Sequence, residues 1–303
     1  MILDLELEIF ILIAIGYYLG KKNLLNKQTV SQLTDFVIRV VLPCSIVSSF
    51  EMELTYQIMM STMQVLLLSL GIQVVYWIFN HCLYNRWPHD EKINAQYGTM
   101  VSNASFVGMP IAQSLYGVTG LLYSSIYVLP QRIFMWSYGL SLYTDQKDKH
   151  LMKKILAHPC VISIFIGIVV MICYSKGVYL PSGISQTLKA IGGCSTVLCF
   201  VIIGTIVSES NIKELVSKHS LLFSLYRLLI IPLIMFVIVY FLSIDTLSKK
   251  VCVLLTTMPA ATTTVIFANQ YERNSHFASQ LVIMSTLLSL VSIPFFSMIL
   301  ELI

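Results

Sequence analysis

The chain has 303 residues, of which 56 % are hydrophobic and only 11 % are charged, with a formal net charge of +4. Soluble domains carry about 25 % charged residues, so this composition argues against an ordinary soluble enzyme. It also excludes an intrinsically disordered chain, which needs low hydrophobicity and high charge. The sequence has no basic clusters of the kind that bind nucleic acid. A chain of this length instead has room for about ten membrane spans of ~20 residues each.

Ten hydrophobic stretches can be followed along the chain. They cover about 5–20, 33–50, 58–84, 95–116, 119–143, 156–174, 184–208, 219–243, 250–271 and 277–302. In lipid the backbone must satisfy its own hydrogen bonds, so these stretches are expected to be helices. The N-terminal flank of the first stretch is acidic, with Asp4, Glu6 and Glu8, and lacks the positive residues of a signal peptide. We therefore do not expect it to be cleaved. The prediction is an all-α polytopic protein of the cell membrane.

The loop charges predict its orientation. With the N-terminus outside, the inner connections carry Lys21, Lys22, Lys27, Arg86, Lys92, Lys147, Lys149, Lys153, Lys154, Lys213, Lys218 and Arg273, and the outer ones carry Lys176, Lys249 and Lys250. Lysine and arginine accumulate on the cytoplasmic side of membrane proteins. Both termini are therefore predicted to lie outside.

The long charged connection Asp145–Lys154 divides the chain into residues 1–150 and 151–303, with five spans in each half. Two related halves with an odd number of spans must insert in opposite orientations, which is the inverted repeat of many secondary transporters. Met109-Pro110 and Met258-Pro259 occupy the fourth span of each half and support such a repeat.

The fourth and ninth spans are unusually polar and each contains a proline, Pro110 or Pro259. Proline removes a backbone donor and clashes with the preceding turn, and Gly108 makes a break near Pro110 easier. Paired interrupted spans point to a transporter's substrate site. The alternative is a simple kink, stabilised by nearby Ser and Thr, as expected for the prolines of other spans. Those prolines are Pro43, Pro130, Pro232 and Pro294.

Residues 103–110, NASFVGMP, resemble the N-x-G-F-x-G-x-P signature of the auxin efflux carrier family. Met258-Pro259 followed by FANQY at 267–271 is similar to the ninth span of that family. Leu42-Pro43, WSYG at 136–139 and STLLSL at 285–290 also fit, so the resemblance covers nearly the whole chain.

This resemblance implies ten helices in two inverted five-helix repeats, with spans four and nine crossing as broken helices. It also implies a scaffold bundle and a moving transport bundle. The family includes plant auxin exporters and bacterial permeases associated with malate or malonate, and the short loop after span five is of the bacterial type. Ser105, Thr263, Arg39 and Arg132 depart from common family residues, so auxin is not carried over as the substrate.

Arginine is the only charged residue type expected deep within the spans, because none of the fifteen carboxylates lies near the middle of one. An arginine at a span centre costs about 2.5–3.5 kcal/mol and is usually paired or functional. Arg132, near the middle of span five, is expected either to bind an anion or to hold a structural hydrogen bond. Arg39 could bind an anion, extend to the interface or pair with Asp35 one turn away. Arg227 is predicted to be an interface anchor.

The candidate substrate-binding residues surround the two breaks and the buried arginines. They are Asn103, Ser105, Gly108, Pro110, Gln131, Arg132, Arg39, Pro259, Thr262 and Thr263. For the threonines of span nine, hydrogen bonding to the preceding turn is an equally open alternative.

The function predicted from these features is secondary transport of a small organic anion, a mono- or dicarboxylate, by alternating access. An auxin-like aromatic acid carrier and a channel or sensor are the alternatives. The chain lacks the motifs of metal, phosphate and serine-nucleophile chemistry, so we expect no enzyme, metal or cofactor. A homodimer is left open.

Overall fold

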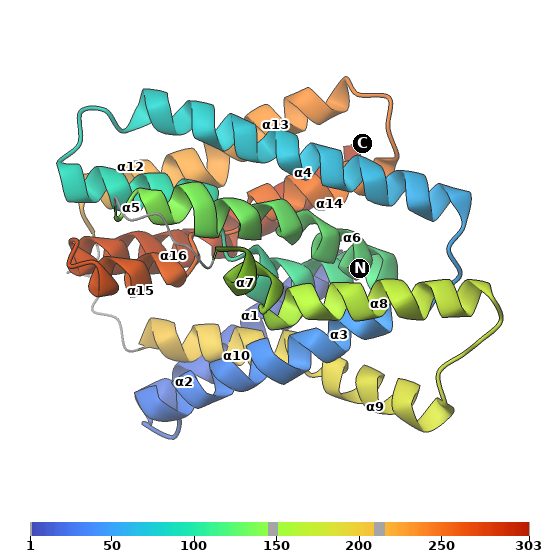
Figure 1. Cartoon of the computed structure of the whole chain (residues 1–303). Coiled ribbons are helices and arrows are strands. Elements are labelled where there is room, and N and C mark those ends of the chain that lie inside the picture. Colours follow the sequence, from blue (N-terminus) through green and yellow to red (C-terminus); the bar gives the residue numbers. More distant parts are fainter. Residues whose placement is uncertain (1, 145–150, 209–215, 303) are drawn as a thin grey trace. The chain divides into compact units, whose positions relative to one another are not determined.

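A computed structural model describes residues 2–144, 151–208 and 216–302 as helices joined by short connections (Figure 1). The α-helices in chain order are α1 (Ile2–Lys21), α2 (Lys27–Phe36), α3 (Leu42–Ser49), α4 (Tyr56–Leu83), α5 (His89–Met100), α6 (Met109–Phe134), α7 (Leu151–Leu156), α8 (Pro159–Ser175), α9 (Ser182–Gly193), α10 (Ser195–Ser208), α12 (Lys218–Leu225), α13 (Ile231–Tyr240), α14 (Thr246–Thr256), α15 (Thr263–Gln270) and α16 (Ser275–Ile299). Four π-helical segments extend them: η1 (Val37–Val41), η2 (Ala104–Gly108), η3 (Met135–Gly139) and η4 (Tyr226–Ile230). A 3-10 turn, η5 (Leu300–Leu302), ends the described chain. The predicted all-α class is confirmed.

Five helical runs are long and apolar enough to cross a membrane. They are Lys27–Ser49, Tyr56–Leu83, Ser182–Ser208, Lys218–Tyr240 and Ser275–Leu302, and Pro159–Ser175 is a shorter apolar helix. Within α6, Gly117 takes φ 65° and ψ −154° and separates two helical stretches. This break falls between the predicted fourth and fifth spans. The full set of ten spans stays a prediction.

The chain folds into two compact units, each built from both halves of the sequence. Unit 1 comprises Met1–Met63, Ser105–Ile126 and Leu156–Ser210; unit 2 comprises Gln64–Ala104, Tyr127–Ile155 and Asn211–Ile303. The units therefore differ from the predicted repeats 1–150 and 151–303, which stay a prediction. Part of the connection that divides those repeats, together with Lys147, Lys149 and Lys213 of the orientation argument, lies outside the described residues.

In unit 1, α1 packs along α10, and the two backbones approach closely because each helix has a glycine that faces the other. A Cβ on Gly16 would lie 2.1 Å from the carbonyl oxygen of Val201, and one on Gly204 would lie 2.1 Å from that of Ile13. The Thr205 hydroxyl donates to the Gly16 carbonyl at 3.0 Å. Glycine allows this approach, and the hydroxyl adds an interhelical hydrogen bond.

In unit 2, α12 packs against α16, and α5 packs against α16. A buried cluster joins them through Tyr84, Ala95, Phe223, Ala260, Phe277, Leu281 and Val282. Ala260 belongs to the break in the ninth predicted span, so this core holds the break in place.

Three of the π-helical segments end two residues before a proline: η1 before Pro43, η2 before Pro110 and η4 before Pro232. Proline cannot donate the usual i→i−4 hydrogen bond, and a locally widened turn is one way to accommodate that loss. Pro130 and Pro294 instead lie inside α6 and α16. The prolines therefore widen some helices and leave others continuous.

Candidate functional site

The first break lies where α5 ends. Val101 is extended, with φ −114° and ψ 98°, and helical structure resumes as η2 at Ala104. Ser102 and Asn103 thus form a short non-helical link in the middle of the predicted fourth span. Its sequence favours this because Gly108 and Pro110 weaken the helix that follows.

The second break lies between α14 and α15. Helix α14 ends at Thr256, residues 258–260 are non-helical, and α15 starts at Thr263. The hydroxyls of Thr256 and Thr257 donate to the carbonyls of Val253 and Leu254 at 2.6 and 2.7 Å. For these two threonines, hydrogen bonding to the preceding turn is confirmed.

The two breaks meet in unit 2 as a short antiparallel pair. Ser102 and Ala260 form the bridge. The Asn103 N–H donates to the Pro259 carbonyl at 2.8 Å, and the Ala261 N–H donates to the Val101 carbonyl at 3.1 Å. Backbone groups freed within a membrane must find partners in protein or water. Here the freed groups of one broken helix satisfy those of the other.

Side chains complete the hydrogen bonding of this crossing. The Gln131 amide donates to the Ser102 carbonyl at 2.6 Å, and its oxygen accepts from the Ser102 hydroxyl at 3.1 Å. The Ala260 N–H donates to the Ser285 hydroxyl at 3.2 Å. Ser102 and Ser285 were not among the predicted site residues, because serine is common in membrane helices. The position of Ser102 directly before Asn103 was the one available signal.

Asn103 has a half-buried side chain. Its backbone is fixed by Pro259, whereas its side-chain amide has no hydrogen bond to any described residue. An amide offers both two donors and an acceptor. It is therefore available to a ligand at the crossing.

Arg132 follows Gln131 on α6 and is half-buried. One of its Nη atoms lies 3.3 Å from the Met135 sulfur, and its charge acts on Tyr97. The Tyr97 hydroxyl in turn donates to Thr263 Oγ1 at 3.0 Å, at the start of α15. Arg132 thus lies on the side of the crossing where α15 begins.

Unit 2 brings together Asn103, Gln131, Pro259 and Thr263 of the predicted site, with Thr262 exposed beside them and Arg132 near Tyr97. The remaining predicted residues belong to unit 1. There Ser105, Gly108 and Pro110 are buried and Arg39 is exposed. Arg39 and Asp35 are both exposed and form no ion pair within the described chain.

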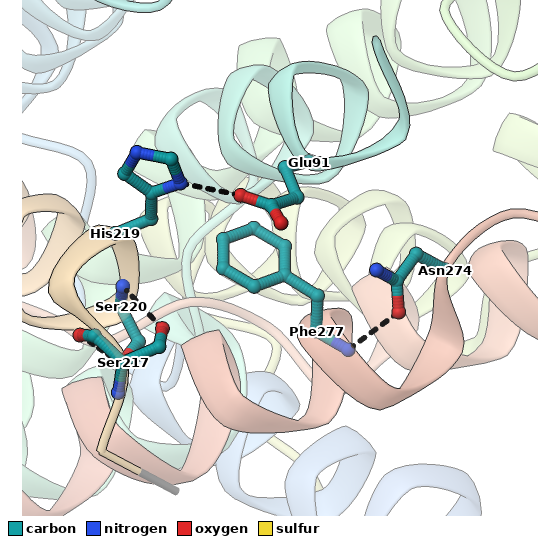
Figure 2. A network of polar contacts seen from close by, with 6 residues as sticks. All are labelled: Glu91, Ser217, His219, Ser220, Asn274 and Phe277. Carbon is teal, nitrogen blue, oxygen red and sulfur yellow. Dashed lines mark hydrogen bonds and ion pairs between the residues drawn. The ribbon is translucent and has the colours of Figure 1, made fainter. Parts of the chain in front are cut away.

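The start of α5 is fastened to neighbouring helices of unit 2 (Figure 2). Glu91 contacts His219 of α12, with 2.5 Å between Oε2 and Nδ1, and Trp87 stacks on the same imidazole at 4.3 Å between ring centroids. Asp90 pairs with Arg273 at 3.3 Å. These contacts hold the first turn of α5, at the end of the helix that lies away from the crossing.

Each neighbouring helix is itself capped beside this cluster. Ser217 and Ser220 form a reciprocal capping box at the start of α12, with both bonds at 3.0 Å. Asn274 accepts from the Phe277 N–H at 3.0 Å to start α16, and its carbonyl accepts from Asn94 at 2.9 Å. The caps fix the helix starts that face α5, as Figure 2 shows.

Arg227 corrects the sequence interpretation. It was expected to be an interface anchor, but its side chain has 0 % exposure within unit 2. The hydrophobic pattern placed Arg227 near one end of a predicted span. It did not show that the side chain points into the protein interior.

The two stretches that form the crossing contain no acidic residue. No Asp or Glu occurs between Lys92 and Thr144 or between Asp245 and Glu272, the two stretches that form the breaks and span five. Their charged residues are Arg132, Lys249 and Lys250, and their other polar groups are amides, hydroxyls and helix starts, which carry partial positive charge. The described residues contain no group of three His, Cys, Asp or Glu side chains able to hold a metal.

Known proteins place this architecture in a family. The chain matches the membrane transport protein family in two segments, residues 2–152 and 144–297. It is similar to an uncharacterized transporter of Methanothermobacter thermautotrophicus, with 26 % identity over 303 residues and 97 % of each chain covered. It is also similar to an uncharacterized transporter of Methanocaldococcus jannaschii, with 21 % identity over 306 residues and 98 % of each chain covered. The resemblance to the auxin efflux carriers is thereby confirmed: the chain belongs to their membrane transport protein family, as a multi-pass helical membrane protein.

Proposed function

We propose that this protein is a secondary transporter of a small organic anion, a mono- or dicarboxylate, with the crossing of the two broken helices as its binding site. The observation that carries the proposal is the backbone pairing of Ser102 with Ala260, beside the available amide of Asn103. Interrupted spans that meet in this way characterise the substrate sites of secondary transporters.

The substrate class follows from charge. A carboxylate matches the planar guanidinium of Arg132 and the amide of Asn103. The starts of η2 and α15 add backbone donors that favour negative charge. A cation substrate has no comparable set of ligands in these stretches.

The proposed mechanism divides the work between the units. Unit 2 carries the crossing, with Gln131 and Ser102 keeping its backbone rigid. The substrate binds to Asn103 and Arg132, and movement of one unit relative to the other exposes it to the opposite side. In this proposal ten spans cross as two inverted repeats, with both termini outside.

The test begins with purified protein and a panel of mono- and dicarboxylates, including malate, malonate and indole-3-acetate. Compounds that raise the melting temperature are then assayed for counterflow in proteoliposomes. Saturable exchange of a carboxylate supports a carrier. A flux that does not saturate indicates a channel, and binding without flux indicates a sensor. Either result would contradict the proposal.

A further inference from the structure

Arg227 is a second buried cation that the proposed transport site does not use. It lies in η4, the π-helical segment within the span Lys218–Tyr240, and is among the largest fully buried side chains of the described chain. Such widened turns occur frequently at functional sites. The guanidinium keeps its charge in proteins, so burial cannot be relieved by loss of a proton.

Most hydrogen-bond donors of the Arg227 guanidinium have no partner among the described residues. Nη1 donates to the Tyr76 hydroxyl at 2.9 Å, and the guanidinium carbon lies 4.9 Å from the centre of the Tyr76 ring. Nε and Nη2 are buried and have no hydrogen-bond partner among the described residues. No described carboxylate pairs with Arg227, so its charge is not neutralised by this part of the chain.

Tyr127 of α6 presents a further buried donor. It is 1 % exposed, and its hydroxyl lies close to that of Tyr76 but makes no hydrogen bond of ordinary length with a described residue. Both Arg227 and Tyr76 act electrostatically on Tyr127. Two guanidinium nitrogens without partners and the Tyr127 hydroxyl therefore gather around Tyr76, all within unit 2.

The wall of α4 that carries Tyr76 is polar although it is buried. Ser69, Gln73 and Asn80 lie on the same helical face, because the spacing of positions 69, 73, 76 and 80 follows the helical repeat. All three are at most 1 % exposed. This face of α4 carries neutral polar groups and no negative charge.

We propose that Arg227 and Tyr127 form a buried site for one small monovalent anionic group, either a halide or a single carboxylate. The anion accepts from Nε and Nη2 of Arg227 and from the Tyr127 hydroxyl, and it neutralises the buried charge. Tyr127 lies one helical turn from Gln131 on α6, so the site adjoins the support of the crossing but uses different side chains. The inference does not depend on the proposed transport activity.

Equilibrium binding of ³⁶Cl⁻ and of ¹⁴C-acetate to the purified full-length protein tests this site. We expect at least one of these probes to bind the wild type saturably. We expect Arg227→Gln to bind one equivalent less of that probe, since the site proposed at the crossing keeps its own side chains. Chloride binding alone identifies a halide site, whereas acetate binding that chloride competes identifies a site that also accepts carboxylates. Arg86→Gln changes an exposed arginine in the same way and is expected to leave binding unaltered.

Tyr127→Phe keeps the ring and removes only the hydroxyl. This variant still tests the anion site if Arg227→Gln fails to fold. We expect about tenfold weaker binding, as for loss of one hydrogen bond to a charged group. Asn103→Ala is expected to keep the bound anion and so separates this site from the crossing. Absence of saturable binding to the wild type, an unchanged number of bound equivalents in Arg227→Gln, or loss of an equivalent only in Asn103→Ala would overturn the proposal.

Discussion

Gln131 is the side chain on which the crossing depends most directly. It accepts from the hydroxyl and donates to the carbonyl of Ser102 in a buried position. Gln131→Leu removes both bonds and leaves that carbonyl without its donor, which we expect to lower the free energy of unfolding by about 1–3 kcal/mol. The melting temperature in detergent is the measurement. Gln270→Leu alters an exposed glutamine in the same way and should shift the melting temperature less. Equal shifts in the two variants would show that the Ser102 contacts contribute nothing to stability.

At the residue scale, the sequence pointed to several side chains that lie at the crossing but did not predict their surroundings. Asn103 and Gln131 were identified from a signature and from their place beside Arg132. The burial of Arg227 was missed because depth along a span does not determine which way a side chain faces. Ser102 was missed because its role lies in its backbone pairing with Ala260, which the sequence does not reveal.

At the element scale, close helix packing in unit 1 leads to a paired prediction on two glycines. A Cβ on Gly16 would meet the Val201 carbonyl oxygen at 2.1 Å, whereas a Cβ on Gly71 would meet nothing within 4 Å. Gly16→Ala should therefore separate α1 from α10 and lower the melting temperature by several degrees. Gly71→Ala should leave it unchanged or raise it, since alanine is the better helix former. Similar effects of the two substitutions would contradict the close contact.

The fastening of α5 leads to a second prediction at this scale. Glu91→Gln replaces a charged acceptor of His219 with a neutral amide, so the first turn of α5 should open more often. Hydrogen exchange followed by mass spectrometry should show faster exchange across His89–Met100. Glu53→Gln removes an exposed carboxylate of unit 1 and serves as the control. Unchanged exchange in the Glu91 variant would mean that Asp90 and Trp87 suffice.

Most of the helices could be predicted from the sequence. The lengths of the hydrophobic stretches, the polar connections between them and the interruptions of spans four and nine are all visible there. The π-helical segments were not, because their side-chain pattern differs little from that of an α-helix over five residues. Pro43, Pro110 and Pro232 were expected to kink or break their spans. Each follows a widened turn, and the break in the span of Pro110 lies earlier, at Ser102 and Asn103. The difference arises because a helix can absorb the missing donor by changing its hydrogen-bond register.

At the scale of the whole molecule, the distribution of loop charge predicts that both termini lie outside. A C-terminal alkaline phosphatase fusion should therefore be active, and a C-terminal green fluorescent protein fusion should be dark. The reverse pair of results would invert the orientation without affecting the crossing, since the breaks are held by contacts within unit 2.

The two compact units show what sequence order alone does not predict. Each draws helices from both halves of the chain, so neighbours in sequence separate and distant segments pack together. The breaks at 101–103 and 257–262 lie more than a hundred residues apart, yet they form one backbone pair. A motif search locates each break, but only the folded chain joins them.

The central claim, that the crossing binds a transported organic anion, is tested most directly by counterflow of a radiolabelled carboxylate in proteoliposomes. Four proteins suffice: the wild type, Asn103→Ala, Arg132→Gln and the exposed control Arg86→Gln. We expect saturable exchange by the wild type and by the control, with half-saturation raised about 3- to 10-fold by Asn103→Ala and about 10- to 100-fold by Arg132→Gln, as expected for losing a neutral or a charged hydrogen bond. Wild-type exchange kinetics in both site variants would contradict the account.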